Sequence, residues 1–195
     1  MNQLLALARA EGSQSALARE SCDLAALTIA VVQDCLPRAL EKSIDLGYEG
    51  AQPGGNGVKL EGNATLIGEL IRNLLDNAIH YTPSSGERPG VVTARVLVDP
   101  FGKVLLLQVE DSGPGIAAAE RELVFQPFYR KLGNEAEGSG LGLSIVLEIA
   151  KRHGATVSQD EARRGHVAPG SLFTVRFDTS GQIAAAAVQT QSPTT

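Results

Sequence analysis

Two asparagines stand one helical turn apart in the segment RNLLDNAIHY, and they are the first residues whose types and spacing could do chemistry. Asn73 and Asn77 are four residues apart. Glu69 precedes them and Tyr81 follows them at the same spacing, so all four share one face of a helix. Amide oxygens suit magnesium, which prefers oxygen ligands and keeps several waters. The face indicates a cation site, or else a pair of solvated amides on a half-exposed helix.

Two glycine-containing segments could complete a site with that face. Residues 111–115 (DSGPG) follow an apolar, strand-like run, so a carboxylate stands at the edge of the core beside glycines that allow close backbone approach. Residues 138–142 (GSGLG) precede an apolar-striped helix, where free N–H groups can bind phosphate. Each segment alone also fits a tight turn or a flexible hinge. Together the three clusters hold the parts that a nucleotide needs.

The composition excludes several other classes of protein. The 195 residues carry a formal net charge of −5, so no basic footprint indicates nucleic acid. No apolar run reaches the roughly 20 residues of a membrane span, so we expect no direct membrane contact by this segment. Cys22 and Cys35 are too few for a disulfide framework, which favours a reduced, cytoplasmic setting.

Hydrophobic patterns with helical or strand-like spacing predict the elements that would position these clusters. Without regular alternation of strand and helix, this order predicts an α+β, two-layer sandwich. We expect helices at 23–42, 63–82 and 141–152, and strands at 43–50, 57–61, 91–98, 103–109, 155–160 and 171–177.

Four motifs resemble, in order and spacing, the boxes of sensor histidine kinase catalytic domains. They are NLLDNAIHYTP, VEDSGPGI, VFQPFYR and GSGLGLSIV, which match the N, first glycine, F and second glycine boxes. The resemblance implies a Bergerat ATP-binding fold, with a mixed sheet packed on three main helices and a mobile ATP lid, and ATP and Mg²⁺ as cofactors. It also implies that 1–20 are the end of a dimerisation helix with its linker and that 21–178 are the catalytic domain. The uncharged composition of 179–195, rich in alanine, glutamine, threonine and serine, predicts a disordered tail.

The resemblance assigns roles to individual residues. Asn77 would be the magnesium ligand, Asn73 would bind phosphate or metal-bound water, and Asp111 would accept a hydrogen bond from the adenine amino group. A guanine oxygen would meet that carboxylate acceptor to acceptor. Arg130 and Lys131 would assist Asn73 in catalysis. The other nucleotide-binding positions would be His80, Tyr81, Gly113, Gly115, Ile116, Gly138, Ser139, Gly140, Leu141 and Gly142.

Four further expectations concern residues around these boxes. We expect Phe125 and Phe128 to anchor the lid on apolar surface. His80 stands where relatives often carry a lysine or arginine, and it could instead be a plain surface histidine. Leu141 fits the core as well as the site. His153 ends a helix, which favours capping or packing over catalysis.

None of the three histidines has a phosphoacceptor context, so the phosphorylated histidine would belong to a dimerisation domain absent from this chain. The implied partners are that domain, in a homodimer, and the receiver domain of a response regulator. The resemblance also implies a cytoplasmic domain of a protein in the bacterial inner membrane. The alternatives are an ATPase clamp or a serine-directed kinase of the anti-sigma type. ATPases of this superfamily carry a glutamate base where this chain has Asn73, which cannot take a proton from water.

Overall fold

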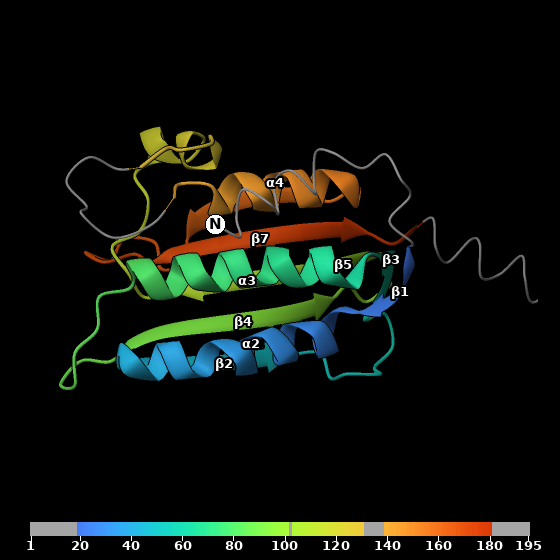
Figure 1. Ribbon diagram of the computed structural model, residues 1–195, viewed down its shortest axis with the longest axis horizontal. Helices are drawn as coiled ribbons and strands as arrows, with labels where there is room; N and C mark the ends of the chain where they lie inside the picture. The colour runs from blue at the N-terminus through green and yellow to red at the C-terminus, as the bar shows by residue number, and fades with distance from the viewer. Residues whose placement is uncertain (1–18, 102, 131–138, 181–195) are drawn as a thin grey trace, which may run out of the picture.

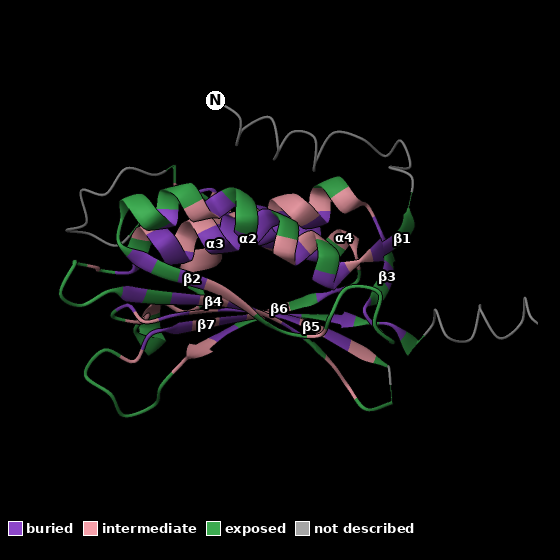
Figure 2. Ribbon diagram, turned by 90° about the horizontal axis from the view of Figure 1, so that it is seen from below, coloured by how far each residue is buried: buried purple, intermediate pink, exposed green. Residues whose placement is uncertain are grey.

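The protein is a two-layer sandwich in which three helices cover one face of a five-stranded sheet (Figures 1 and 2). The computed structural model describes residues 19–101, 103–130 and 139–180. The sheet has the strand order β2-β4-β5-β7-β6. Its strands are β2 (Ile44–Gly50), β4 (Gly90–Val98), β5 (Val104–Asp111), β6 (Thr156–Glu161) and β7 (Ser171–Asp178). The pair β2–β4 is parallel and the others are antiparallel, so the predicted mixed sheet is confirmed.

Local sequence signals set where the three helices begin and end. They are α2 (Leu24–Glu41), α3 (Ala64–Tyr81) and α4 (Gly142–Arg152). Asp23 and Asn63 cap α2 and α3 by accepting hydrogen bonds from backbone N–H groups of the first turn, at 2.9 and 3.0 Å. Gly154 follows α4 with a φ of +65°, a conformation that glycine adopts without strain. The helix α2 continues through Pro37 to its predicted end.

The core lies between the helices and the sheet because buried residues recur at the repeat of each element, every second residue in a strand and along one face of a helix. Strand β5 buries every second residue, and the helices bury one stripe each (Figure 2). Leu70, Leu74 and Leu107 are fully buried at this interface. Completely burying such side chains stabilises the fold by about 1.5–3 kcal/mol each. The opposite face of the sheet bears partly exposed residues, both polar and apolar.

A small second sheet was not predicted in full. Strand β1 (Glu20–Asp23) pairs antiparallel with β3 (Lys59–Gly62), and Glu20 faces Gly62 in the register. The sequence predicted β3 but not β1, because a four-residue strand with charged ends carries little local signal. Its pairing depends on a partner that lies about 40 residues further along the chain.

His153 joins the ends of two helices, as a capping or packing role predicts. Its Nδ1 lies 2.8 Å from the Ile149 carbonyl, and the Asn63 backbone N–H donates to its Nε2 at 3.1 Å. These bonds require a neutral ring with the proton on Nδ1, because one nitrogen must donate while the other accepts. Burial lowers the pKa of His153, although the bond to Ile149 opposes that shift.

The segment between β5 and α4 contains two short 3₁₀ turns, η1 (Ala118–Glu120) and η2 (Leu123–Phe125), which stand beside α4 in Figure 1. Phe125 anchors η2, with its ring edge-on to Phe173 at a centroid distance of 6.1 Å. The expectation for Phe128 is wrong: its side chain is 68% exposed. Its φ of +64° turns the chain so that the ring leaves the core.

Several predicted features fall outside the described residues. They include the end of a dimerisation helix in 1–18, the tail from 181 onward, and residues 131–138 of the predicted lid. The domain limits therefore stay predictions. Within the described residues, no helix is both long and apolar enough to cross a membrane.

Candidate functional site

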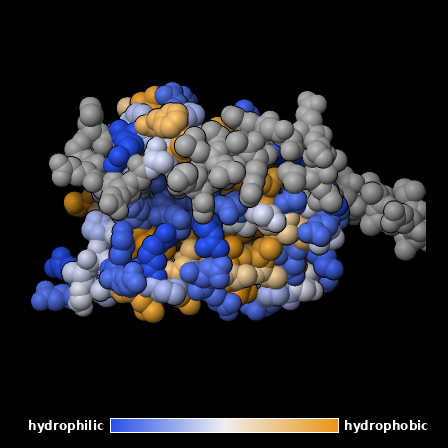
Figure 3. Space-filling model, viewed as in Figure 1, coloured by the Kyte–Doolittle hydropathy of each residue, from blue (hydrophilic) through white to orange (hydrophobic). Residues whose placement is uncertain are grey.

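A cavity of about 330 Å³ lies at the C-terminal end of α3 and brings the predicted clusters together. Its walls come from α2, α3, the end of β5 with the turn after it, the segment 116–130, and the start of α4. Hydrophilic side chains gather at the C-terminal ends of α2 and α3 (Figure 3). The predicted residues that line the cavity are Asn73, Asn77, His80, Tyr81, Asp111, Gly115, Ile116, Arg130, Ser139, Gly140 and Gly142.

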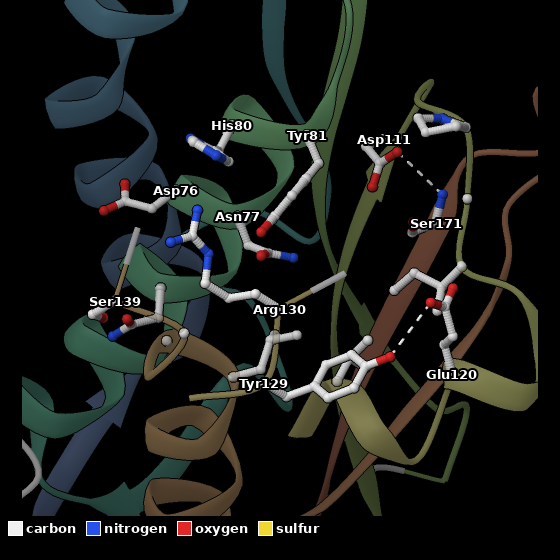
Figure 4. Close-up of a pocket in the computed structure, with 18 of the residues that line it drawn as sticks. Asp76, Asn77, His80, Tyr81, Asp111, Glu120, Tyr129, Arg130, Ser139 and Ser171 are labelled. Carbon is white, nitrogen blue, oxygen red and sulfur yellow. Dashed lines mark hydrogen bonds between the residues drawn. The ribbon is translucent and has the colours of Figure 1, made fainter. Parts of the chain in front are cut away.

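One end of the cavity is built around Asp111, the last residue of β5. The Asp111 side chain is buried, and its Oδ1 accepts hydrogen bonds from the backbone N–H groups of Gly113 at 2.8 Å and Ser171 at 3.2 Å. Both of these backbone bonds go to the same carboxylate oxygen. Burial raises the pKa of the Asp111 carboxyl above its ordinary value, although hydrogen bonds from the Gly113 backbone and from the backbone and side chain of Ser171 oppose that shift. The backbone bonds to Oδ1 therefore orient the carboxylate beside Ser171 at this end of the cavity (Figure 4).

The first glycine segment keeps this end compact. A Cβ on Gly113 would lie 2.9 Å from both Asp111 Oδ1 and the Tyr81 carbonyl oxygen, so no other residue fits without movement. Gly113 does not line the cavity but fixes the carboxylate that does. Gly115 has a φ of +76°, and Ile116 follows it along the cavity wall. The turn thus supplies a narrow, partly apolar wall next to a single buried acceptor.

The face of α3 presents amides toward the cavity, as predicted. The Asn73 amide is buried, and its Nδ2 donates to the Glu69 carbonyl at 2.8 Å. Its Oδ1 would lie 3.2 Å from a Cβ on Gly142, so the start of α4 packs directly against it. Asn77 is half-buried and points into the cavity (Figure 4). Asn73 is therefore fixed by its neighbours, while Asn77 faces the open space.

The other end of the cavity carries positive charge. Arg130 extends from the segment after η2 toward Asp76 and Asn77 on α3 (Figure 4). His80 lines the same wall, and its ring stands edge-on to Tyr81 at 4.7 Å. Arg38 of α2 also lines the cavity and forms an ion pair with Asp76. This hydrogen bond raises the pKa of the Arg38 guanidinium, which stays charged at any working pH.

The second glycine segment closes the cavity beside α4. Gly140 has a φ of +70°, and its carbonyl accepts a hydrogen bond from the Phe128 N–H at 2.9 Å, which ties the F box to this segment. Ser139 and Gly142 line the cavity, and Gly142 begins α4. Leu141 does not line it, because its side chain is 1% exposed and belongs to the core. Lys131 and Gly138 lie outside the described residues.

Sequence reasoning missed five polar residues of this cavity. Ser171 is held next to Asp111 by strand pairing, 60 residues away in the chain. The Tyr129 hydroxyl donates to a Glu120 carboxylate oxygen at 3.4 Å across the cavity wall. The aromatic and charged residues of the F box could have indicated Tyr129, but no local pattern points to the others. The missed residues are Arg38, Asp76, Glu120, Tyr129 and Ser171.

The arrangement can hold an elongated ligand with an amino group at one end and anionic groups at the other. Asp111 accepts a hydrogen bond at the first end, and Arg38, Arg130 and His80 offer donors at the second. In the described residues, no group of three or more histidine, cysteine, aspartate or glutamate side chains could hold a metal ion by itself. A cation at Asn77 would therefore take most of its ligands from the bound anion and from water.

Comparisons with known proteins point to one family. Residues 62–181 match the family described as histidine kinase-, DNA gyrase B-, and HSP90-like ATPase. Sensor protein QseC of Escherichia coli O157:H7 is 34% identical over 165 residues, which cover 85% of this chain and 34% of that protein. The histidine-protein kinase/phosphatase MprB of Mycobacterium sp. (strain KMS) is 40% identical over 120 residues, or 61% and 22% of the two chains. The chain thus spans a third or less of these relatives.

Solved structures show the same fold. The mycobacterial sensor histidine kinase MprB aligns with a TM-score of 0.69 and 28% identity, over 82% of this chain and 97% of that one. The cytoplasmic segment of histidine kinase QseC aligns with a TM-score of 0.55 and 26% identity, over 90% and 88% of the two chains. These similarities support the fold of this chain.

Proposed function

Because the chain belongs to the family of histidine kinase-, DNA gyrase B-, and HSP90-like ATPases, we propose that its cavity binds ATP with magnesium for phosphoryl transfer to a histidine. The chain would be the catalytic part of a sensor histidine kinase. One observation carries the proposal: the buried Asp111 carboxylate, fixed through Oδ1, offers Oδ2 to a cavity whose opposite end holds arginines.

The base would lie at the Asp111 end. The free carboxylate oxygen accepts a hydrogen bond from the adenine amino group, and a guanine oxygen at the same place would leave two acceptors facing each other. Gly115 and Ile116 would lie against the base, and Tyr81 would pack nearby. Burial of Asp111 makes this discrimination strong, since water cannot replace a missing partner there.

Magnesium would be held by the Asn77 side-chain oxygen together with phosphate and water oxygens. The donor set fits, because a neutral amide adds no negative charge beside the triphosphate, and magnesium keeps several waters. The metal would supply neutralisation of phosphate charge. Asn73 would donate through its Nδ2 group, which the Glu69 carbonyl already orients. Arg130, His80 and the N–H groups at the start of α4 would bind phosphate oxygens, with Lys131 and Gly138 as further candidates.

The residues of the cavity bind and orient, which is most of what phosphoryl transfer requires of a protein. The described part of the cavity places Asn73, not a carboxylate, one helical turn before Asn77. An amide cannot activate water as a general base, so the proposal favours transfer to a protein histidine over hydrolysis by an ATPase clamp. That histidine would belong to a dimerisation domain of a longer protein, in a homodimer.

The wider setting is also part of the proposal. The relatives are named as sensor proteins and histidine kinases, and we infer onward transfer of the phosphoryl group to an aspartate of a response regulator. We further infer that this segment works in the cytoplasm, below a sensor part in the bacterial inner membrane.

Isothermal titration calorimetry of the purified chain with ATP and GTP, each with and without magnesium, tests the binding step. We expect ATP to bind and GTP to bind at least a hundredfold more weakly, since discrimination by an unmatched buried polar group is large. Similar affinities for the two nucleotides would remove Asp111 from its role. The matched variant Asn77→Asp should lose the part of ATP affinity that depends on magnesium and keep the remainder.

A labelling experiment tests the reaction. With radiolabelled ATP and magnesium, the chain alone should neither label itself nor hydrolyse ATP appreciably. Addition of the dimerisation domain of the full-length protein should give a base-stable, acid-labile label on that domain. Steady ATP hydrolysis by the chain alone, lost on Asn77→Asp, would instead place it with the ATPases of its family.

A further inference from the structure

Arg38 lies on a helix that carries none of the four sequence motifs, yet it lines the nucleotide cavity. It stands in the last turns of α2 and reaches α3 through its ion pair with Asp76. Asp76 is the neighbour of Asn77 in the sequence and lines the same wall. The fold thus brings a guanidinium from α2 next to the residue proposed to hold magnesium.

The charge of Asp76 needs compensation in an anion site. A carboxylate beside the phosphates would repel them, and the effect is largest where water is partly excluded. The Arg38 side chain is 45% exposed, so its guanidinium has room to reach a ligand in addition to Asp76. A guanidinium has five N–H donors, and one carboxylate oxygen uses only part of that capacity. Arg38 can therefore hold Asp76 and a phosphate oxygen together.

A purely structural role does not explain this pair well. The same two helices are joined by a second pair, in which Arg72 of α3 donates to Asp34 of α2 at 2.7 Å. That pair stands outside the cavity lining. Half-exposed ion pairs of this kind contribute little to stability, and the buried apolar residues of α2 and α3 already hold the helices together. The two pairs differ chiefly in that Arg38 and Asp76 both line the cavity, whereas Arg72 and Asp34 do not.

The position of Asp76 indicates which part of the ligand Arg38 would meet. Figure 4 shows Asp111 and Ser171 at one end of the cavity and Asp76, with Ser139, at the other. If the base lies at Asp111, the end of the phosphate chain points toward Asp76 and its partner. This step rests on the proposed function.

We propose that Arg38 is a specificity-determining residue that binds the terminal phosphate of the nucleotide and so distinguishes ATP from ADP. Asp76 is the positioning residue that holds the guanidinium at the cavity wall. Arg38 donates to the phosphate oxygens bidentately or singly, and no proton is transferred. Charged hydrogen bonds of this type are about twice as strong as neutral ones, and bidentate arginine contacts suit phosphate.

Binding of ATP and ADP to four proteins, in magnesium and at one ionic strength, tests the proposal. They are the wild type, Arg38→Gln, Asp76→Asn and the matched control Arg72→Gln. We expect Arg38→Gln to weaken ATP binding about tenfold and ADP binding less than threefold. Arg72→Gln removes an equivalent pair outside the cavity and should bind both nucleotides as the wild type does. Circular dichroism of each variant confirms that it is folded.

The variant Asp76→Asn distinguishes a direct contact of Arg38 with phosphate from a purely structural ion pair between α2 and α3. In this variant the asparagine oxygen can still accept a hydrogen bond from the guanidinium, while the negative charge beside the phosphates is removed. If Arg38 binds phosphate, ATP affinity should therefore stay unchanged or rise. If the pair only braces the helices, Asp76→Asn and Arg38→Gln should weaken ATP and ADP by the same factor, and the proposal is wrong. Unchanged ATP binding by Arg38→Gln would also overturn it. A wild type that binds neither nucleotide would instead refute the proposed function on which the inference rests.

Discussion

Replacement of Asp111 by asparagine should separate ligand binding from stability, because the structure gives the two carboxylate oxygens different tasks. Oδ1 accepts backbone N–H groups from Gly113 and Ser171, and these bonds require an acceptor at that place. In Asp111→Asn the amide oxygen should take the position of Oδ1, since the amide nitrogen would face two donors there. The amide nitrogen then replaces Oδ2 and points into the cavity.

The expected loss of affinity follows from that exchange. The adenine amino group loses a charged acceptor, worth about 1.5–3 kcal/mol, and meets a donor that leaves both groups unsatisfied. We expect a total of about 3 kcal/mol, which corresponds to a rise of roughly a hundredfold or more in the ATP dissociation constant. Calorimetric titration of both proteins with ATP measures it, and equal affinities would refute the proposed recognition of adenine by Asp111.

The stability of the same variant should change in the opposite sense at neutral pH. Burial raises the pKa of Asp111 in the folded state, so the protonated carboxyl is the form that the fold favours. Its contribution to stability is fully present below the unfolded pKa and is lost as the pH rises through the folded pKa. Urea unfolding at pH 7 should therefore show Asp111→Asn to be at least as stable as the wild type. A large loss of stability would mean that both oxygens serve the fold.

Three other perturbations test the fold around the site. Burial lowers the pKa of His153 in the folded state, so the unfolded chain binds a proton first as the pH falls below about 6.5. Urea unfolding should therefore show a free energy of unfolding that decreases below this pH, and a smaller decrease in His153→Gln. Phe125→Ala should lower the free energy of unfolding by about 2 kcal/mol, because this ring packs on Phe173 of the core. Phe128→Ala should lower it by less than about 0.5 kcal/mol, because this residue is exposed. Equal losses in thermal or urea unfolding would contradict the assignment. A Cβ on Gly170 would lie 2.0 Å from the Asp111 carbonyl oxygen, whereas a Cβ on Gly165, at a similar positive φ, would have open space. Gly165→Ala should therefore destabilise the fold by ~1 kcal/mol and Gly170→Ala by much more. Similar unfolding free energies for the two variants would count against the close contact at Gly170.

Local patterns in the sequence determined the helices and most of the residues that line the cavity. Asp23 and Asn63 are caps whose hydrogen bonds reach only three residues ahead, so a short window of sequence contains both partners. The amide face of α3 depends on the helical repeat alone. Asp111 was identifiable because an apolar run led into it and glycines followed. Motifs whose members are close in the chain need little more than propensity and spacing to be found.

Tertiary structure decided the residues whose partners are distant in the chain. Ser171 meets Asp111 only because β7 pairs with β5, and Arg38 enters the cavity only because α2 packs beside α3. The same limit applies to the two phenylalanines of the F box. Their types predict equal anchoring, but the left-handed backbone at Phe128 turns its ring to solvent while Phe125 meets Phe173. A sequence records which side chains are available, whereas strand register, helix packing and backbone handedness fix where each one points, and those depend on contacts between residues far apart.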